Sequence, residues 1–369
     1  MSFSAIFLFL VILLVLVIVH EFGHFIVAKW VGMRVDEFAF GFPPRLFSKK
    51  KGETVYAFNL LPLGGYVSIW GENGSEEDKQ KNGAMYHPRA FGNRPWWAQL
   101  LVLIAGVTMN MVLALLIFIT ISYGNIEMSS SDEVYGSRVK DAHIMIVDSS
   151  PESPAYKAGI VPGSILVDVT SNKKVADLTS TSSLVTFIEK HQDDAFSITY
   201  IRPDGGLAST TIAAVYGIVP DKKALGIAID KVGIVKTSFI EAITIGTQRT
   251  YNITMLTFQG LQSLVQSFLQ GEGVVGSLSG PVGIARIVSE TSDYGYVAIL
   301  TLIAILSINL AIFNILPFPA LDGGRIIIVF IETIFRKKIP FKYYSWSNVV
   351  GFSLLMLLLV VVTVHDIRG

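Results

Sequence analysis

The sequence predicts a polytopic α-helical membrane protein with four transmembrane helices, a cytoplasmic-side membrane-reentrant β-hairpin and an extracytoplasmic α+β domain. Two observations favour this fold class. Of the 369 residues, 51% are hydrophobic and only 16% are charged, and the mean hydropathy is +0.54, which is too apolar for a soluble globular chain of this length. In addition, four apolar runs each approach the roughly 20 residues that a helix needs to cross a bilayer.

The apolar runs divide the chain into spans and connecting segments. The predicted spans are residues 1–29, 96–123, 296–324 and 346–369. The predicted connecting segments are a loop at 30–95, a linker at 124–136, a compact domain at 137–231, helices at 232–295 and a loop at 325–345. The N-terminal run has neither the basic region nor the small-residue cleavage site of a signal peptide, so we interpret it as a retained span.

The distribution of charge predicts the orientation. Lys and Arg residues cluster in 30–95 and 325–345, and such clusters stay on the cytoplasmic side of a membrane. Residues 124–295 and both termini are therefore expected outside. The chain has 29 basic and 29 acidic residues and no cysteine, which argues against a nucleic-acid partner and excludes disulfides, thiolate ligands and a cysteine nucleophile.

A β-hairpin is predicted inside the first loop. Residues 55–70 read VYAFNLLPLGGYVSIW, with two β-prone runs on either side of Pro62, Gly64 and Gly65. The segment is unusually apolar for a solvated loop, so we expect it to enter the membrane or to line a cavity there. A small hairpin packed on its own loop is the alternative.

The first span ends in the HExxH pattern His20-Glu21-Phe22-Gly23-His24. On a helix, positions i and i+4 share a face, so both imidazoles can bind one Zn²⁺. Glu21 is then the expected general base, which takes a proton from zinc-activated water and returns it to the leaving amine. The pattern also occurs by chance, but ionisable groups inside a span cost about 2.5–3.5 kcal/mol each, which favours a function.

Asp322 is the best candidate for a third ligand. It lies in the segment NILPFPALDGG, Asn314 to Gly324, and at about 1.5 Å per residue both His20 and Asn314 lie roughly 26 Å from the outer ends of their spans. A helix terminator and a turn are the alternative interpretation of this segment. The competing ligands His87, Glu37 and Asp36 lie in the loop. His143, His191 and His365 fall on the outer side and are expected to be ordinary surface or interface residues.

Four segments together resemble the site-2 protease family of intramembrane zinc metalloproteases, in particular its bacterial RseP branch. They are HEFGH at 20–24, PLGGYV at 62–67, SGPVGIA at 279–285 and NILPFPALDGG at 314–324. The resemblance implies a single zinc ion held by His20, His24 and Asp322, with Glu21 as the catalytic base. It also implies that Asn314, Pro317 and Pro319 lie beside the substrate and that the hairpin at Gly64 and Gly65 offers an edge to an unwound substrate strand.

The outer domain resembles a PDZ domain, most clearly at 153–164 (SPAYKAGIVPGS). The segment 137–231 has room for one such domain, whereas the best-known members of the branch carry two. It is expected to bind a peptide or protein ligand and to act as a size gate or a docking point. Asn110 is interpreted either as a polar contact near the site or as a contact between helices.

The predicted activity is hydrolysis of single-pass membrane proteins in or near their transmembrane segments. By resemblance the substrate is an anti-sigma factor, the location is the bacterial inner or plasma membrane in contact with its lipids, and the active site lies toward the cytoplasm. A non-catalytic membrane PDZ scaffold and an ion or proton transporter are the alternatives, although no paired discontinuous spans favour a transporter. Two imidazoles and a carboxylate also suit Fe²⁺.

Overall fold

A computed structural model describes residues 3–72, 88–132, 134–150, 152–219, 222–271, 273, 276, 278–292 and 294–368. The chain forms two compact units. The helical unit comprises Met1–Phe118, Gly246–Glu290 and Leu300–Gly369, and the sheet unit comprises Ile119–Ile245 and Thr291–Ile299.

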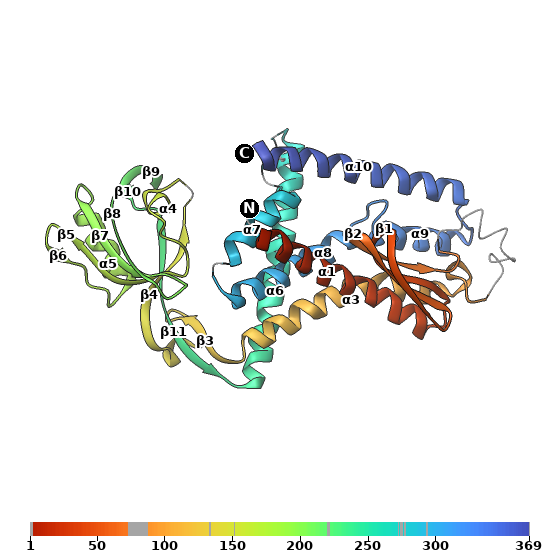
Figure 1. Cartoon of the computed structure of the whole chain (residues 1–369), viewed down its shortest axis with the longest axis horizontal. Coiled ribbons are helices and arrows are strands. Elements are labelled where there is room, and N and C mark those ends of the chain that lie inside the picture. Colours follow the sequence, from red (N-terminus) through yellow and green to blue (C-terminus); the bar gives the residue numbers. More distant parts are fainter. Residues whose placement is uncertain are drawn as a thin grey trace. The chain divides into compact units, whose positions relative to one another are not determined.

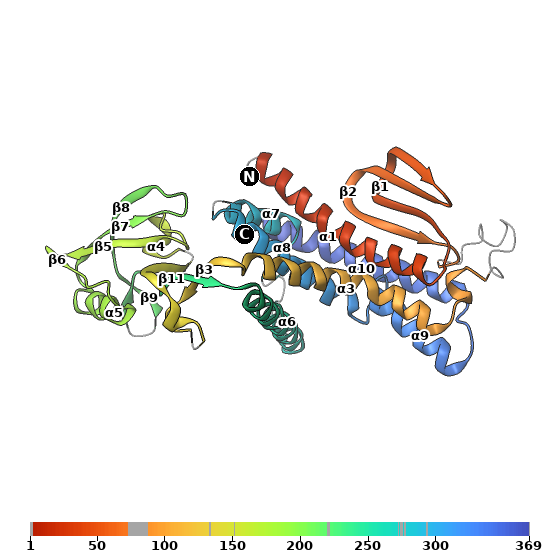
Figure 2. The same cartoon turned by 90° about the horizontal axis from the view of Figure 1, so that it is seen from below.

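Four described helices are long and apolar enough to cross a membrane, as predicted. They are α1 (Phe3–Trp30), α3 (Trp96–Ile121), α8 (Tyr296–Ile315) and α10 (Phe341–Arg368). The third is shorter than the predicted span, because Pro317 and Pro319 follow its end and cannot continue a helix. The N-terminal end of α1 and the C-terminal end of α10 lie at the same end of the helical unit, as an even number of crossings requires (Figures 1 and 2).

A small sheet packs beside α1 and is built from β1 (Val35–Lys51) and β2 (Thr54–Ile69). Both strands bend, so each of them supplies two paired segments to the sheet. Residues 35–40 pair with 65–69 on one side and with 55–58 on the other, and residues 47–51 pair with the outer side of 55–58. The strand segment 65–69 is therefore an edge of the sheet, and we call it the edge strand.

The predicted hairpin at 55–70 is wrong in its pairing. Its two halves do not pair with each other, because residues 35–40 lie between them. The tight reversal is instead the two-residue turn between Lys51 and Thr54, where Gly52 has a φ of +63°. Glycine adopts this left-handed conformation without steric cost, which explains why the chain reverses there.

A further helix, α9 (Asp322–Phe335), occupies much of the predicted loop at 325–345. Its start folds tightly against the end of α8, since a Cβ at Gly323 would lie 2.2 Å from the carbonyl oxygens of Ile315 and Leu316. Further along α9, Val329 is buried against α1 and α3 residues in one apolar cluster. The helix is thus held against α1, which carries the HExxH pattern, and against α3.

The sheet unit is built on one antiparallel sheet with the strand order β3-β11-β4-β5-β7-β8, and β6 pairs with β5. The strands are β3 (Gly124–Ser129), β4 (Lys140–Ser149), β5 (Ile165–Ser171), β6 (Lys174–Val175), β7 (Ala195–Ile201), β8 (Leu207–Ala213) and β11 (Ile227–Thr237), with a separate ribbon of β9 (Val215–Val219) and β10 (Lys222–Ala224). The helical elements are α4 (Pro154–Lys157), α5 (Thr181–Lys190) and the short η3 (Gly136–Arg138), and η2 (Phe91–Asn93) precedes α3 in the helical unit.

The predicted boundaries of the outer domain need one correction. The segment 124–136 is not only a linker, because β3 pairs with residues 232–237 of β11, beyond the predicted end at 231. A small apolar cluster around Ile126 and Val235 holds this extension. The main core of the sheet unit lies around Ile146, Phe196 and Ile198.

Two helices follow the sheet. The first is α6 (Phe239–Leu269), close to the predicted helical segment, and the second is α7 (Pro281–Ser292). The SGPVGIA segment leads into α7 and contacts α10. Its Gly283 amide donates a hydrogen bond to the Asp366 carboxylate of α10 at 2.8 Å. A Cβ at Gly280 would lie 2.8 Å from the same carboxylate, so this segment forms a close helix contact.

Candidate metal centre and active site

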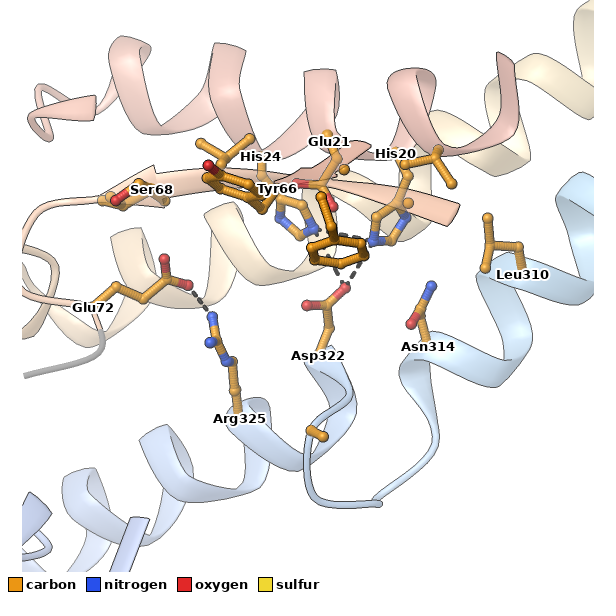
Figure 3. A pocket seen from close by; sticks show the side chains of 17 residues that line it. His20, Glu21, His24, Tyr66, Ser68, Glu72, Leu310, Asn314, Asp322 and Arg325 are labelled. Atoms are coloured by element: carbon orange, nitrogen blue, oxygen red, sulfur yellow. Dashed lines mark hydrogen bonds and ion pairs between the residues drawn. The ribbon is translucent and has the colours of Figure 1, made fainter. Parts of the chain in front are cut away.

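The last turns of α1 bring three polar side chains to one place. His20 and His24 lie one turn apart on the same face and are 7% and 8% exposed. Glu21 lines the same cavity, and Figure 3 shows its side chain beside the two imidazoles. The structure therefore brings the two histidines of the HExxH pattern together, as their i, i+4 spacing on a helix requires.

Asp322, the first residue of α9, completes a group of three possible metal ligands. Its Oδ2 lies 3.1 Å from Nε2 of His20 and 3.4 Å from Nε2 of His24, and the two Nε2 atoms are 3.2 Å apart. Ligand atoms at about 2.0–2.1 Å from a tetrahedral Zn²⁺ are about 3.3 Å from one another. The three atoms thus have the spacing expected of three ligands that would hold one zinc ion.

Backbone contacts fix the imidazole of His24. Its Nδ1 lies 2.7 Å from the carbonyl oxygen of Val102 on α3. A carbonyl only accepts, so Nδ1 must carry the proton, and the neutral ring then presents a lone pair at Nε2. This arrangement is common for metal-binding histidines, whose second nitrogen donates to a nearby acceptor.

Asn110 contacts His20 in a similar way. The Asn110 side chain is fully buried, and its amide nitrogen lies 3.3 Å from Nδ1 of His20, while its Oδ1 has no hydrogen-bond partner. Turning the amide by half a rotation places Oδ1 against an Nδ1–H group, which satisfies both atoms and leaves the lone pair of His20 on Nε2. Asn110 therefore contacts a candidate ligand and is not among the residues that line the cavity.

The electron pairs of the three atoms point at one another. Oδ2 of Asp322 is buried and has no hydrogen-bond partner among the described groups. Two imidazole lone pairs and a carboxylate oxygen repel each other unless a cation lies between them. Two nitrogens and one oxygen are a donor set that Zn²⁺ accepts, so the residues present fit this metal.

The backbone of α3 approaches this group closely at Gly106. A Cβ at this position would lie 2.4 Å from Nε2 of His24 and 2.8 Å from Cε1 of His20. Val102, Gly106 and Asn110 are spaced by four residues and therefore lie on one face of α3. Sequence reasoning missed Gly106, although its position one turn before Asn110 could have indicated it.

A cavity of about 610 Å³ opens beside the three ligand atoms. The edge strand, which begins at Gly65, and the preceding Gly64 form one wall of it, and Asn314 and Asp322 lie on the opposite side (Figure 3). The lining residues are Val17, His20, Glu21, His24, Phe42, Gly64, Gly65, Tyr66, Val67, Ser68, Ile69, Glu72, Leu310, Asn314, Ala320, Asp322 and Arg325. Pro317 and Pro319, predicted beside the substrate, are not among them.

An ion pair between Glu72 and Arg325 also borders the cavity and was not predicted from the sequence. Arg325 follows Asp322 by three residues, so the two share a face of α9. This spacing could have revealed Arg325, but only once the start of a helix had been recognised at Asp322.

The competing ligands have other contacts. Asp36 pairs with Arg34 at 2.6 Å, and Glu37 pairs with Arg45. His87 lies outside the described residues. Nδ1 of His143 and of His191 each contacts a backbone carbonyl in the sheet unit.

Known proteins share this sequence over nearly its whole length. Residues 8–358 match peptidase family M50. A putative zinc metalloprotease of Clostridium perfringens is 35% identical over 352 residues, with 95% of each chain covered, and one of Fusobacterium nucleatum is 32% identical, with 98% of each covered. The regulator of sigma-W protease RasP of Bacillus subtilis is 27% identical over 433 residues, with 98% of this chain and 97% of its own covered.

These matches favour the predicted protease over the scaffold and transporter alternatives, and they confirm zinc as the cofactor. Together with the four apolar helices they also indicate a protein that crosses the membrane several times. The chain belongs to peptidase family M50, the site-2 protease family, and is a membrane-bound zinc metalloendopeptidase.

Proposed function

We propose that the protein is an intramembrane endopeptidase of the RseP branch that cuts single-pass membrane proteins in or near their transmembrane segments. The observation that carries the proposal is the convergence of His20, His24 and Asp322 at zinc-ligand spacing, with both histidines on a helix apolar enough to span a membrane. An HExxH pattern in a soluble helix would suggest a soluble protease. Here the same pattern lies near the end of a candidate span.

His20, His24 and Asp322 are proposed to hold the zinc. When bound there, zinc supplies a Lewis acid that polarises a carbonyl and lowers the pKa of water to about 7. The Glu21 carboxylate borders the cavity beside these ligands. It accepts a proton from the attacking water and later gives a proton to the nitrogen of the leaving amine.

The substrate must be unwound before it is cut, because a membrane helix keeps its carbonyls in its own hydrogen bonds. Among the described residues, the edge strand pairs on one side only, and it lines the cavity together with Glu21. An extended substrate segment can add to it as a further strand, with Gly64 and Gly65 allowing close approach of the backbone. Asn314 offers an amide to the substrate from the opposite wall, and Pro317 and Pro319 shape the loop behind it.

Localisation and partners follow from the same proposal. The substrate is a single-pass protein, with an anti-sigma factor as the expected class, since one relative is named a regulator of sigma-W. The β1–β2 sheet dips into the bacterial plasma membrane from the cytoplasmic side, and the sheet unit, with one PDZ-like domain, lies outside and binds a peptide or protein ligand. The basic residues of 30–95 support this orientation.

Glu21→Gln tests the proposal in reconstituted vesicles with a single-pass substrate. The variant should retain about one zinc per chain and lose cleavage by about 10²–10⁴-fold, because the amide cannot take a proton. Zinc is measured by mass spectrometry of the metal, and the cut site by mass spectrometry of the products. Glu127→Gln, an exposed residue of β3, is the matched control and should cleave normally. Wild-type cleavage by Glu21→Gln would overturn the role of Glu21.

A further inference from the structure

Glu72 and Arg325 join the two walls of the cavity. Arg325 of α9 forms an ion pair with the Glu72 carboxylate, and both side chains line the cavity. Their side chains are 9% exposed for Glu72 and 25% exposed for Arg325. Figure 3 shows the pair on the side of Asp322 opposite to Asn314 and Leu310.

Glu72 is held rigidly at the end of the edge strand. Its amide donates to the carbonyl of Ile69 at 3.1 Å, and Gly71 has a φ of +71° in the turn between them. A Cβ at Gly71 would lie 2.9 Å from Cβ of Ala90, so the turn packs tightly against the segment before α3. The Trp70 amide donates to the carbonyl of Arg34 at 2.9 Å. The position of Glu72 is therefore fixed relative to the edge strand.

Arg325 is held equally well on the other wall. It lies in the first turn of α9, and its amide donates to the carbonyl of Leu321 at 3.3 Å. Asp322, Arg325 and Val329 share one face of the helix, and Val329 is buried against α1 and α3. The same turn of helix thus carries a candidate zinc ligand and one end of the ion pair.

We propose that the Glu72–Arg325 ion pair is a strut that sets the width of the cleft between the edge strand and the turn of α9 that begins at Asp322. Both are positioning residues, because they hold the wall against which the substrate backbone is placed and do not take part in the chemistry. This inference rests on the proposed function. It assigns to the pair a role in aligning the scissile carbonyl, where a misplacement of about 1 Å can cost about 10²-fold in rate.

A double-mutant cycle tests whether the two residues act as one device. Glu72→Gln and Arg325→Gln should each retain zinc and lower kcat/KM for a single-pass substrate by about 10- to 100-fold. The kcat/KM of the double variant should be no lower than that of the less active single variant, because the strut is already absent when either partner is removed. Losses that multiply, or single variants with wild-type kcat/KM, would overturn the proposal. Loss of zinc in either single variant would also overturn it.

Two further variants make the result specific. Glu72→Asp keeps the charge but shortens the arm by one methylene group, and it should lower kcat/KM by at least threefold; wild-type cleavage would show that only charge matters and would overturn the strut. This variant also serves if the neutral variants do not fold. Lys338→Gln is the control, since it breaks a more exposed ion pair of α9, with Glu332, which is not among the residues lining the cavity. This variant should cleave normally.

A distance measurement separates this proposal from the proposed function. The chain has no cysteine, so spin labels at Ser68→Cys on the edge strand and Ile327→Cys on α9 report one distance. The distribution should be narrow with the wild-type pair and broaden or shift with Glu72→Gln. An unchanged distribution would overturn the strut whether or not the protein cleaves. A changed distribution in a protein that cuts no substrate would leave the strut standing and refute the proposed function.

Discussion

At the scale of single residues, Gly106 controls how closely α3 can approach the two histidines. We expect Gly106→Ala to weaken zinc binding by about 10- to 100-fold, because its Cβ would lie 2.4 Å from Nε2 of His24. Alanine is otherwise the better helix former by about 1 kcal/mol, so a general loss of helix stability is not the expected cause. Competition with a chelator of known affinity measures the effect.

The control for this prediction is another glycine in the middle of a helix. Gly260 of α6 has nothing within 4 Å of the position of an added Cβ. Gly260→Ala should therefore bind zinc as the wild type does. Equal zinc affinity in Gly106→Ala and Gly260→Ala would contradict the close approach of α3 to the metal ligands.

The residues of the candidate centre were predictable to the extent that they depend on local geometry. The spacing of His20 and His24 follows from the turn of one helix, and the depth of Asp322 follows from the helical rise. The sequence allows two interpretations of Asn110, because only the packing of α3 against α1 decides which side chain it contacts. Glu72 and Arg325 were missed since their pairing joins segments 253 residues apart, and no local pattern records it.

At the scale of elements, the loop between α8 and α9 is held by α10. The Asn348 side chain accepts a hydrogen bond from the Ala320 amide at 3.3 Å, and Ala320 has an unusual φ of +74°. One turn further along α10, a Cβ at Gly351 would lie 2.5 Å from the Pro319 carbonyl. The helix therefore contacts the backbone just before Asp322.

Asn348→Leu should lower cleavage by about 10-fold, since outer contacts of this kind typically contribute about 10- to 100-fold to metal affinity or activity. Asn348→Asp keeps an acceptor oxygen and should recover most of the loss. Rates on a single-pass substrate and zinc content are measured together for both variants. If the leucine and aspartate variants are equally impaired, the hydrogen bond to Ala320 is not what matters.

A second element contact predicts a dependence on pH. Glu53, in the turn between β1 and β2, accepts hydrogen bonds from Arg89 at 2.7 and 2.9 Å and from Lys29, near the end of α1, at 2.5 Å. Arg89 first and Lys29 second lower the pKa of Glu53 to about 2, from an ordinary value of 4.5. A lowered pKa means that the folded state favours the carboxylate, so its contribution to stability is complete above pH 4.5 and disappears as the pH falls toward 2.

Thermal unfolding in detergent checks this dependence. At pH 7 the free energy of unfolding of the wild type should exceed that of Glu53→Gln by about 1–2 kcal/mol, because the variant loses charge-assisted hydrogen bonds. The difference stays this small because solvent partly screens them at this half-buried position. The difference should shrink steadily below pH 4.5. Glu290→Gln, at an exposed position on α7, is the control and should show no comparable change. A difference in free energy of unfolding between the wild type and Glu53→Gln that stays constant down to pH 3 would contradict the prediction.

The sheet shows why elements were harder to predict than the zinc ligands. The β-prone runs of 55–70 are recognisable, but their partner at 35–40 lies 18 residues from one run and 25 to 34 residues from the other. It also leads into a Pro43-Pro44 pair that interrupts the strand pattern. Pairing over such distances depends on which apolar faces meet. The same reason explains β3, where Ile126 is buried only because β11 continues to Thr237.

At the scale of the whole molecule, the composition and the four apolar runs predicted the helical unit well, and the predicted orientation can now be tested with single thiols. Lys50 is an exposed residue of β1, and Asp204 is exposed in the turn between β7 and β8. The natural chain has no cysteine, so Lys50→Cys and Asp204→Cys each introduce the only thiol. Because basic loops stay in the cytoplasm, position 50 should face inward and position 204 outward.

In intact cells, a maleimide that cannot cross the membrane should therefore label Asp204→Cys and leave Lys50→Cys unmodified. After the cells are permeabilised, both should react, which shows that each thiol is reachable in the folded protein. The extent of labelling is read from the mass of the purified chain. Labelling of Lys50→Cys alone in intact cells would invert the orientation and place the opening of the cavity outside. Labelling of both would mean that the two units lie on one side, which an odd number of crossings between positions 50 and 204 cannot produce.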